Sequence, residues 1–134
     1  MNRILKNQNI IYLLILIVIV SFTQCSGSVE SQLQSVAKET NRDCPIMRDQ
    51  WTRLDSCSVQ GENTFRYYFT IVQIVVTDTT NLKSQIKPQI IETVKTHPST
   101  RIFRDNDVTL VYRYNDEKGK YLFTIVASPQ DYKK

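Results

Sequence analysis

The stretch from Thr64 to Thr77 constrains the fold more than any other part of the sequence, because its side chains alternate as they do in a half-buried β-strand. One set of alternating positions carries bulky residues: Phe65, Tyr67, Phe69 and Ile71. Aromatic and β-branched residues favour strands, so this set predicts a strand with one face against a core. A weaker alternation from Thr52 to Val59, followed by turn-forming residues 60–63, predicts that the two segments form a β-hairpin.

A second hairpin is predicted near the end of the chain. Two alternating segments, Val108 to Tyr114 and Tyr121 to Ser128, flank a polar stretch that contains Gly119. Such a stretch favours a tight turn between antiparallel strands. The final residues, 131–134, are predicted to be a polar tail.

Two further segments carry apolar residues at helical spacing. The first predicted helix starts at Val29 and ends before Cys44, because the proline that follows disfavours helical backbone at that residue. The second runs from about Thr79 to Lys95, with Pro88 at a kink or in its first turn. The predicted fold class is α+β, in the order helix, β-hairpin, helix, β-hairpin, with a four-stranded, mainly antiparallel sheet and the helices on one face.

The first 28 residues have the anatomy of an export signal. Arg3 and Lys6 precede an unbroken apolar run from Ile10 to Val20, and residues 21–28 form a short, mostly polar exit. We therefore interpret residues 1–28 as a signal peptide and tether and residues 29–134 as a single α+β domain. The protein is expected to be exported to the cell envelope.

Three fates of this leader lead to different membrane contacts. In the favoured one, cleavage precedes Cys25, which is acylated as in a bacterial lipoprotein, although Gln24 matches the usual pattern poorly. In the second, cleavage after Ser28 releases a soluble periplasmic or secreted protein. In the third, the apolar run stays as an anchor, but it would rise only about 16 Å as a helix against a hydrocarbon core of roughly 30 Å.

The cysteine count bears on the same choice. The chain has three cysteines, and an odd number in an exported protein asks for an explanation of the unpaired one. If Cys25 is lipidated or removed, Cys44 and Cys57 remain as a possible disulfide pair, which export favours. Two unpaired thiols are the alternative.

The charge balance argues against nucleic acid as a partner. The formal net charge of +4 includes Arg3 and Lys6, so a chain starting at Cys25 keeps 15 basic against 13 acidic side chains. These charges are interspersed and form no basic stripe of the kind that follows a phosphate backbone.

No motif for catalysis, metal binding or a cofactor is present. His97 is the single histidine and precedes Pro98, where a capping or solvated role is expected. No nucleophile is linked to it by a motif. An enzyme would need a pocket that gathers Asp49, Asp55 or His97 between aromatic walls.

Several short segments together resemble a family of small exported bacterial envelope proteins of uncharacterised function, many with lipoprotein-like leaders. The segments are Asn41-x-x-Cys44-Pro45, residues 52–56, residues 67–70, Leu82-Lys83 with residues 87–89, and residues 108–112. The resemblance implies an envelope location and a single fold over the mature chain. It supplies no catalytic residue.

The sequence therefore predicts a non-enzymatic binding module, held at the membrane through an N-terminal lipid or signal anchor. Its partner is expected to be an envelope protein or polymer that contacts the sheet or its edges. An inhibitor or immunity-type protein of an envelope hydrolase is the alternative within binding functions, and a small enzyme is the alternative outside them.

Overall fold

The computed structural model describes residues 27–134, so the predicted lipidation site Cys25 lies outside the described part. Four α-helices, one short 3-10 helix and five strands are described: α2 (Val29–Asp43), β1 (Ile46–Met47), β2 (Thr52–Gln60), β3 (Thr64–Ile71), α3 (Thr79–Thr96), η1 (Pro98–Thr100), α4 (Arg101–Asp105), β4 (Thr109–Asp116), β5 (Tyr121–Ala127) and α5 (Pro129–Tyr132). In this part of the chain, no helix has the length and apolar character needed to span a bilayer.

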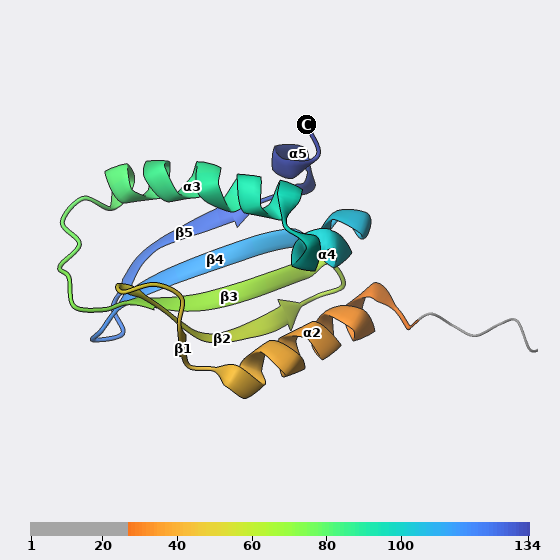
Figure 1. The fold of residues 1–134 in the computed structure, drawn as a ribbon, viewed down its shortest axis with the longest axis horizontal. Helices are drawn as coiled ribbons and strands as arrows, with labels where there is room; N and C mark the ends of the chain where they lie inside the picture. Colours follow the sequence, from red (N-terminus) through yellow and green to blue (C-terminus); the bar gives the residue numbers. More distant parts are fainter. Residues whose placement is uncertain (1–26) are drawn as a thin grey trace, which may run out of the picture.

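The strands form one sheet in the order β1-β2-β3-β4-β5 (Figure 1). Both predicted hairpins are confirmed, since β2 pairs antiparallel with β3 and β4 with β5. The sheet differs from the predicted four strands in that the two-residue strand β1 adds a fifth. It is mainly antiparallel, as predicted, with β3 and β4 as its parallel pair. The parallel pair arises because the chain crosses over through α3 between these strands, which returns it in the same direction.

A β-bulge lets β2 bury residues that a regular strand would place on opposite faces. Leu54 and Cys57 are three positions apart, yet both are buried, with 4% of each exposed. The pairing register shifts between Leu54 and Ser56, so Asp55 is the extra residue of the bulge. One extra residue reverses the alternation, and Leu54 and Cys57 therefore face the same core.

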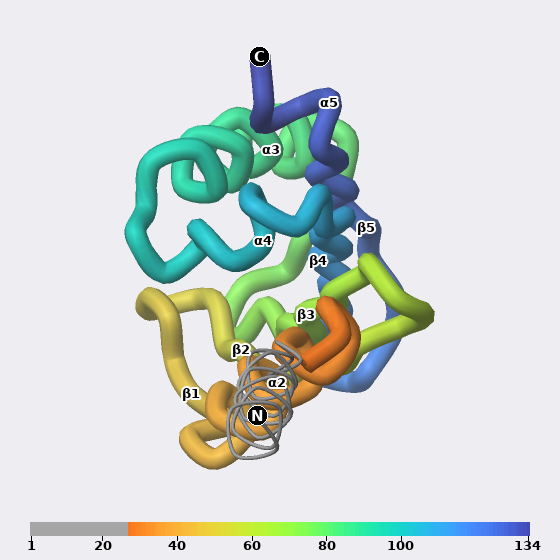
Figure 2. The backbone as a smooth tube through the Cα atoms, turned by 90° about the vertical axis from the view of Figure 1, so that its right-hand side faces the viewer, coloured from red at the N-terminus to blue at the C-terminus, as the bar shows by residue number. Residues whose placement is uncertain are grey.

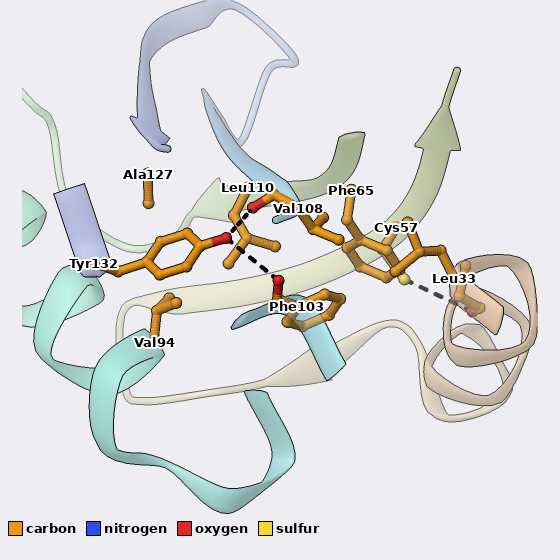
Figure 3. Packing of buried hydrophobic residues seen from close by; sticks show 10 residues of the cluster. Leu33, Cys57, Phe65, Val94, Phe103, Val108, Leu110, Ala127 and Tyr132 are labelled. Atoms are coloured by element: carbon orange, nitrogen blue, oxygen red, sulfur yellow. Dashed lines mark hydrogen bonds between the residues drawn. The ribbon is translucent and has the colours of Figure 1, made fainter. Parts of the chain in front are cut away.

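The core lies on one face of the sheet, as predicted (Figure 3). Helices α2, α3, α4 and α5 contribute Leu33, Val94, Phe103 and Tyr132, which pack against Phe65 and Leu110 of the central strands. In Figure 1, α3 lies along the β5 side of the sheet and α2 along the β2 side. Figure 2 shows α3 and α4 on the same side of strands β3 to β5.

Helix α2 attaches to the sheet through a side chain as well as through its apolar residues. The Asn41 Nδ2 atom donates to the Cys57 carbonyl at 2.9 Å, and its Oδ1 atom accepts from the Cys57 amide at 2.8 Å. Strand β1 pairs only with Arg53 and Leu54, so this part of β2 is a free sheet edge. Asn41 therefore supplies the two hydrogen bonds that a neighbouring strand would make.

The end of strand β3 and the start of helix α3 are set by local backbone conformation and helix capping. Strand β3 ends at Ile71, earlier than the predicted Thr77, and Gln73 then takes a positive φ of 64° that is incompatible with a continuing strand. Asp78 caps the helix that follows by accepting a hydrogen bond from the Asn81 amide at 2.9 Å. Pro88 lies inside α3.

The end of the chain is not the polar tail that its composition predicted. Residues Pro129–Tyr132 form helix α5, which starts with a capping box between Ser128 and Asp131. Tyr132 is 3% exposed, and its hydroxyl donates to the Val108 carbonyl at 2.7 Å (Figure 3). The last helix thus closes one end of the core.

Candidate functional site

A groove of about 370 Å³ lies between α2 and the segment from α3 to α4, above the central strands. Leu54, Tyr67, Phe69 and Tyr112 of the sheet form its floor. Its walls are Val36 and Thr40 of α2 on one side and Thr93, Thr100 and Phe103 on the other, with Arg48, His97 and Ser99 completing the lining. A hollow along the outer side of α3 is lined by that helix alone, whereas the groove brings together residues distant in sequence.

Two stacked tyrosines dominate the floor of the groove. The rings of Tyr67 and Tyr112 have centroids 5.1 Å apart and planes 20° from parallel. Phe65 and Phe69 flank Tyr67, with centroids at 4.9 Å and 6.1 Å. Aromatic pairs of this kind add about 0.5–1.5 kcal/mol beyond the burial of their surface, so the floor is a rigid apolar platform.

The hydroxyl groups of these two tyrosines have no hydrogen-bond partner among residues 27–134, although the Tyr68, Tyr121 and Tyr132 hydroxyls do. Burial raises the pKa of both Tyr67 and Tyr112, so the two hydroxyls stay protonated at neutral pH. The platform therefore carries two unused polar groups. A molecule lying in the groove can satisfy them with its own acceptors.

The wall opposite α2 is fixed by the way α3 ends. One guanidinium nitrogen of Arg104, Nη1, donates to the carbonyls of Val94 and His97 at 2.6 and 3.0 Å and to the Thr100 hydroxyl at 2.7 Å. A cation at a helix C-terminus satisfies free carbonyls and interacts favourably with the helix dipole. Arg104 thus holds the turn that carries Thr100 into the groove.

His97 has the capping role expected from its position. It is the C-cap of α3, and its Nδ1 atom accepts from the Ser99 amide at 3.3 Å and lies 2.7 Å from the Ser99 hydroxyl. The ring also lies at the rim of the groove. Its hydrogen bonds are therefore structural, within the turn that follows α3.

The two cysteines of the predicted disulfide are both free thiols in the structure, so the predicted bond is not formed there. Each sulfur instead faces a different carbonyl of α2. The Cys44 Sγ atom donates to the Thr40 carbonyl at 3.4 Å, and the Cys57 Sγ atom lies 3.7 Å from the Ala37 carbonyl and 3.4 Å from the Asn41 Oδ1 atom. Burial is the largest effect on Cys57 and raises its pKa to about 11.

The carboxylates that an enzyme would need are not gathered in the groove. Asp49 accepts hydrogen bonds from the amides of Trp51 and Thr52 at 2.7 and 2.8 Å, which forms the turn before β2. Asp55 pairs with Arg53 at 2.6 Å on the opposite face of the sheet. Of the three residues considered for catalysis, only His97 lines the groove.

The groove suits binding of an apolar segment, because its floor is apolar and aromatic and its polar groups without a partner in the described chain are the Tyr67 and Tyr112 hydroxyls and the Arg48 guanidinium at its edge. The sequence predicts Tyr67 on the core face of its strand, but it assigns no face to Tyr112 and does not bring the two together in a site. The available signal was the hydroxyl itself, because a tyrosine at a core position needs a partner for its polar end. Tyr114 gives the same signal without lining the groove, so the signal alone does not define the site.

A family described as a domain of unknown function, DUF8479, matches residues 28–123. No curated protein matches the chain.

Solved structures with the same fold include a predicted secreted protein from Pseudomonas aeruginosa, with a TM-score of 0.64, 15% identity, and 77% of this chain and 91% of that one covered. The type 2 secretion system pilotin EpsS from Vibrio vulnificus gives a TM-score of 0.63 at 12% identity, covering 78% and 91%. The type II secretion system pilotin AspS from Vibrio cholerae gives 0.60 at 10% identity, covering 77% and 91%. At these identities the likeness establishes a shared fold.

Proposed function

The chain belongs to the family described as a domain of unknown function, DUF8479, and we propose that it is a non-enzymatic binding module of the cell envelope. In this proposal the groove between α2 and α4 docks an apolar segment of a partner protein. The single observation that carries it is the floor of the groove, where the stacked rings of Tyr67 and Tyr112 present two hydroxyls without partners.

The chemistry of the groove defines the segment that fits it. Leu54 and Phe69 offer apolar contact, so the segment needs apolar side chains that lose water on docking. The hydroxyls of Tyr67 and Tyr112 need acceptors, which carbonyl or polar side-chain oxygens of the segment supply. Because an unsatisfied acceptor or donor in an apolar contact costs free energy, these hydroxyls select for a segment that pairs with them.

The leader supports placement of this module at a membrane. Ser28 is already the N-cap of α2, with its Oγ atom accepting from the Ser31 amide at 3.2 Å. If Cys25 carries the lipid, only residues 26 and 27 separate it from the helix cap. Three residue steps span at most about 10 Å, so the proposed anchor holds the start of α2 close to the bilayer surface.

The likeness to pilotins EpsS and AspS supports a role of the same general kind. Both belong to type II secretion systems, and both share the fold of this chain. We infer an assembly-related role in which the module holds an envelope protein near the membrane rather than transforming a substrate. The dispersal of Asp49 and Asp55 away from His97 favours this over an enzyme.

The anchor is tested by intact-mass measurement of the chain isolated from the membrane fraction of cells that produce it. The proposal predicts a chain that begins at Cys25 and carries acyl groups. An unacylated chain that begins at Val29 would contradict anchoring while leaving the groove untested by that measurement.

The groove is tested with two neighbouring positions of α3. Thr93 lines the groove, whereas Glu92 faces the outer side of the helix. Thr93→Trp fills the groove, and Glu92→Trp is the matched control. On native gels of detergent extracts, the unchanged chain and Glu92→Trp are expected to migrate with a partner and Thr93→Trp to migrate alone.

Identical migration of all three chains would contradict the assignment of the groove as the docking site, provided urea unfolding shows that Thr93→Trp is folded. A partner identified as an envelope hydrolase whose activity falls in the complex would assign the inhibitor or immunity-type function instead.

A further inference from the structure

The face of the sheet opposite the core carries a second candidate contact surface. We call it the outer face and define it by Arg66, Tyr68 and Thr70 of β3, Arg113 and Asn115 of β4, and Tyr121 of β5. These residues alternate with the core-facing Tyr67, Phe69, Tyr112 and Tyr114, so their side chains point away from the helices. Tyr121, at the start of β5, is 49% exposed, and Val126, near the end of the same strand, is 43% exposed.

Two arginines of the outer face have no carboxylate partner within residues 27–134. Arg53, Arg101 and Arg42 each pair with an acidic side chain, but Arg66 and Arg113 do not. Arg113 lies over the Tyr121 ring, with its Cζ atom 5.1 Å from the ring centroid. Asp55, which contacts the Thr70 hydroxyl of this face, is paired with Arg53.

The outer face also holds the buried polar atoms that lack a partner in the described part of the chain. These are the Nε atom of Arg66 and the Oδ1 atom of Asn115, both closed off from solvent. Buried donors and acceptors are normally paired, so unpaired ones ask for an explanation. Because both atoms are closed off from solvent, a ligand cannot reach them as the side chains stand, and what this face offers a ligand is its two guanidinium groups without a carboxylate partner.

The electrostatics of Tyr68 agree with an excess of positive charge here. The pKa of its hydroxyl is lowered, first by the hydrogen bond from the Ser58 hydroxyl at 3.4 Å and then by the neighbouring Arg66 and Arg113. Any anion brought to this face meets the same two guanidinium groups.

We propose that the outer face binds an extended, acidic segment of a partner protein, with carboxylates paired to Arg66 and Arg113. In the parallel register Tyr68 lies beside Arg113, so Arg66 and Arg113 are on adjacent strands and offset by two residues. Strand geometry places such positions roughly 8 Å apart, which is close to the roughly 7 Å between alternate side chains of an extended peptide. A segment with acidic residues at every second position therefore matches both arginines.

A protein segment fits this face better than a lipid headgroup does. Tyrosine and arginine are enriched at protein contacts, where rings supply apolar area and guanidinium groups pair bidentately with carboxylates. The outer face joins Tyr68 and Tyr121 to the two arginines. This proposal stands independently of the groove on the other side of the sheet.

The test uses a decapeptide of alternating Glu and Thr as the probe and the full chain in nonionic detergent. Binding is followed by the backbone amide shifts of β3 and β4 in NMR spectra at low salt. The proposal predicts binding that weakens about tenfold or more in the double variant Arg66→Gln/Arg113→Gln, a loss of about 1.4 kcal/mol. Lys118→Gln removes the same type of charge from the exposed β4–β5 turn and is expected to change binding less than about twofold.

A neutral peptide of alternating Gln and Thr separates charge pairing from simple strand addition and is expected not to bind. Three outcomes would overturn the proposal: no binding of the acidic peptide to the unchanged chain, equal loss in Lys118→Gln, or equal binding of the neutral peptide. Arginine-dependent binding to phosphatidylglycerol vesicles without binding to the peptide would assign the face to a lipid surface and overturn the protein assignment.

Discussion

Tyr67 and Tyr112 lie side by side on the parallel strands β3 and β4, with ring centroids 5.1 Å apart and planes 20° from parallel. Their rings complete the aromatic layer of the core, while their hydroxyls have no partner among the described residues. The same two side chains therefore stabilise the sheet and leave polar groups at the floor of the groove. Mutation can therefore separate the contribution of each ring to stability from the contribution of its hydroxyl to binding.

Removing the hydroxyl from Tyr112 is expected to leave the fold intact. Tyr112→Phe keeps the stacked ring and deletes a group with no partner, so the free energy of unfolding should change by less than about 0.5 kcal/mol. Tyr132→Phe is the matched control, because it removes a hydroxyl that donates to the Val108 carbonyl and should cost about 1–2 kcal/mol. Urea unfolding measures both, and equal losses would contradict the proposed difference.

Asn41 is expected to contribute to stability through the free edge of β2. Asn41→Ala removes both hydrogen bonds to the Cys57 backbone, for an expected loss of about 1–2 kcal/mol. Gln34→Ala, on an exposed position of the same helix, should change stability by less than about 0.5 kcal/mol. If Asn41→Ala unfolds at the same urea concentration as Gln34→Ala, the side chain does not support the edge.

Arg104 is expected to hold the end of α3. Arg104→Ala leaves the carbonyls of Val94 and His97 without their charged donor, and the expected loss is about 1–3 kcal/mol. Arg101→Ala provides the control, since Arg101 makes an exposed ion pair with Asp105 that should contribute less than about 1 kcal/mol. Amide hydrogen exchange in the last turn of α3 should rise in Arg104→Ala and stay unchanged in Arg101→Ala.

The buried thiol of Cys57 makes stability depend on pH in the alkaline range. Its pKa rises from an ordinary 9.0 to about 11 in the folded chain, so the unfolded chain loses this proton first. The contribution of this thiol to the free energy of unfolding is fully present below pH 9. It is lost as the pH rises to about 11, which lowers the free energy of unfolding by at most about 3 kcal/mol. In Cys57→Ala the decline over this range should be shallower, and a parallel decline in both chains would show that other groups cause it.

Most of the fold follows from the sequence where patterns are long and local. Alternation in β3 and β4 identifies the strands and their core faces, because burial of one face imposes a period of two. The strand β1 was missed, since Ile46–Met47 is too short to show a period. Leu54 and Val59 are five positions apart, which no regular strand places on one face, and the bulge at Asp55 accounts for that spacing.

The site was less predictable than the fold, because it depends on where separate elements meet. Nothing in the local sequence of Thr40, Thr93 or Tyr112 indicates that the three line one groove. Cys44 and Cys57, which cysteine parity predicted as a disulfide, are free thiols in the structure, and the geometry that a disulfide needs is not reported by spacing along the chain. The capping box at Ser128 was a local signal that identifies α5.

The most direct test of the groove is photo-crosslinking in cells, with a benzophenone amino acid placed at position 93 or at the adjacent position 92. Thr93 lines the groove and Glu92 does not, so the two chains differ only in which way the crosslinker points. We expect a covalent adduct at position 93 that maps to an apolar segment of one envelope protein, with little adduct at position 92. Equal yields from both positions, or no protein adduct at position 93, would contradict it.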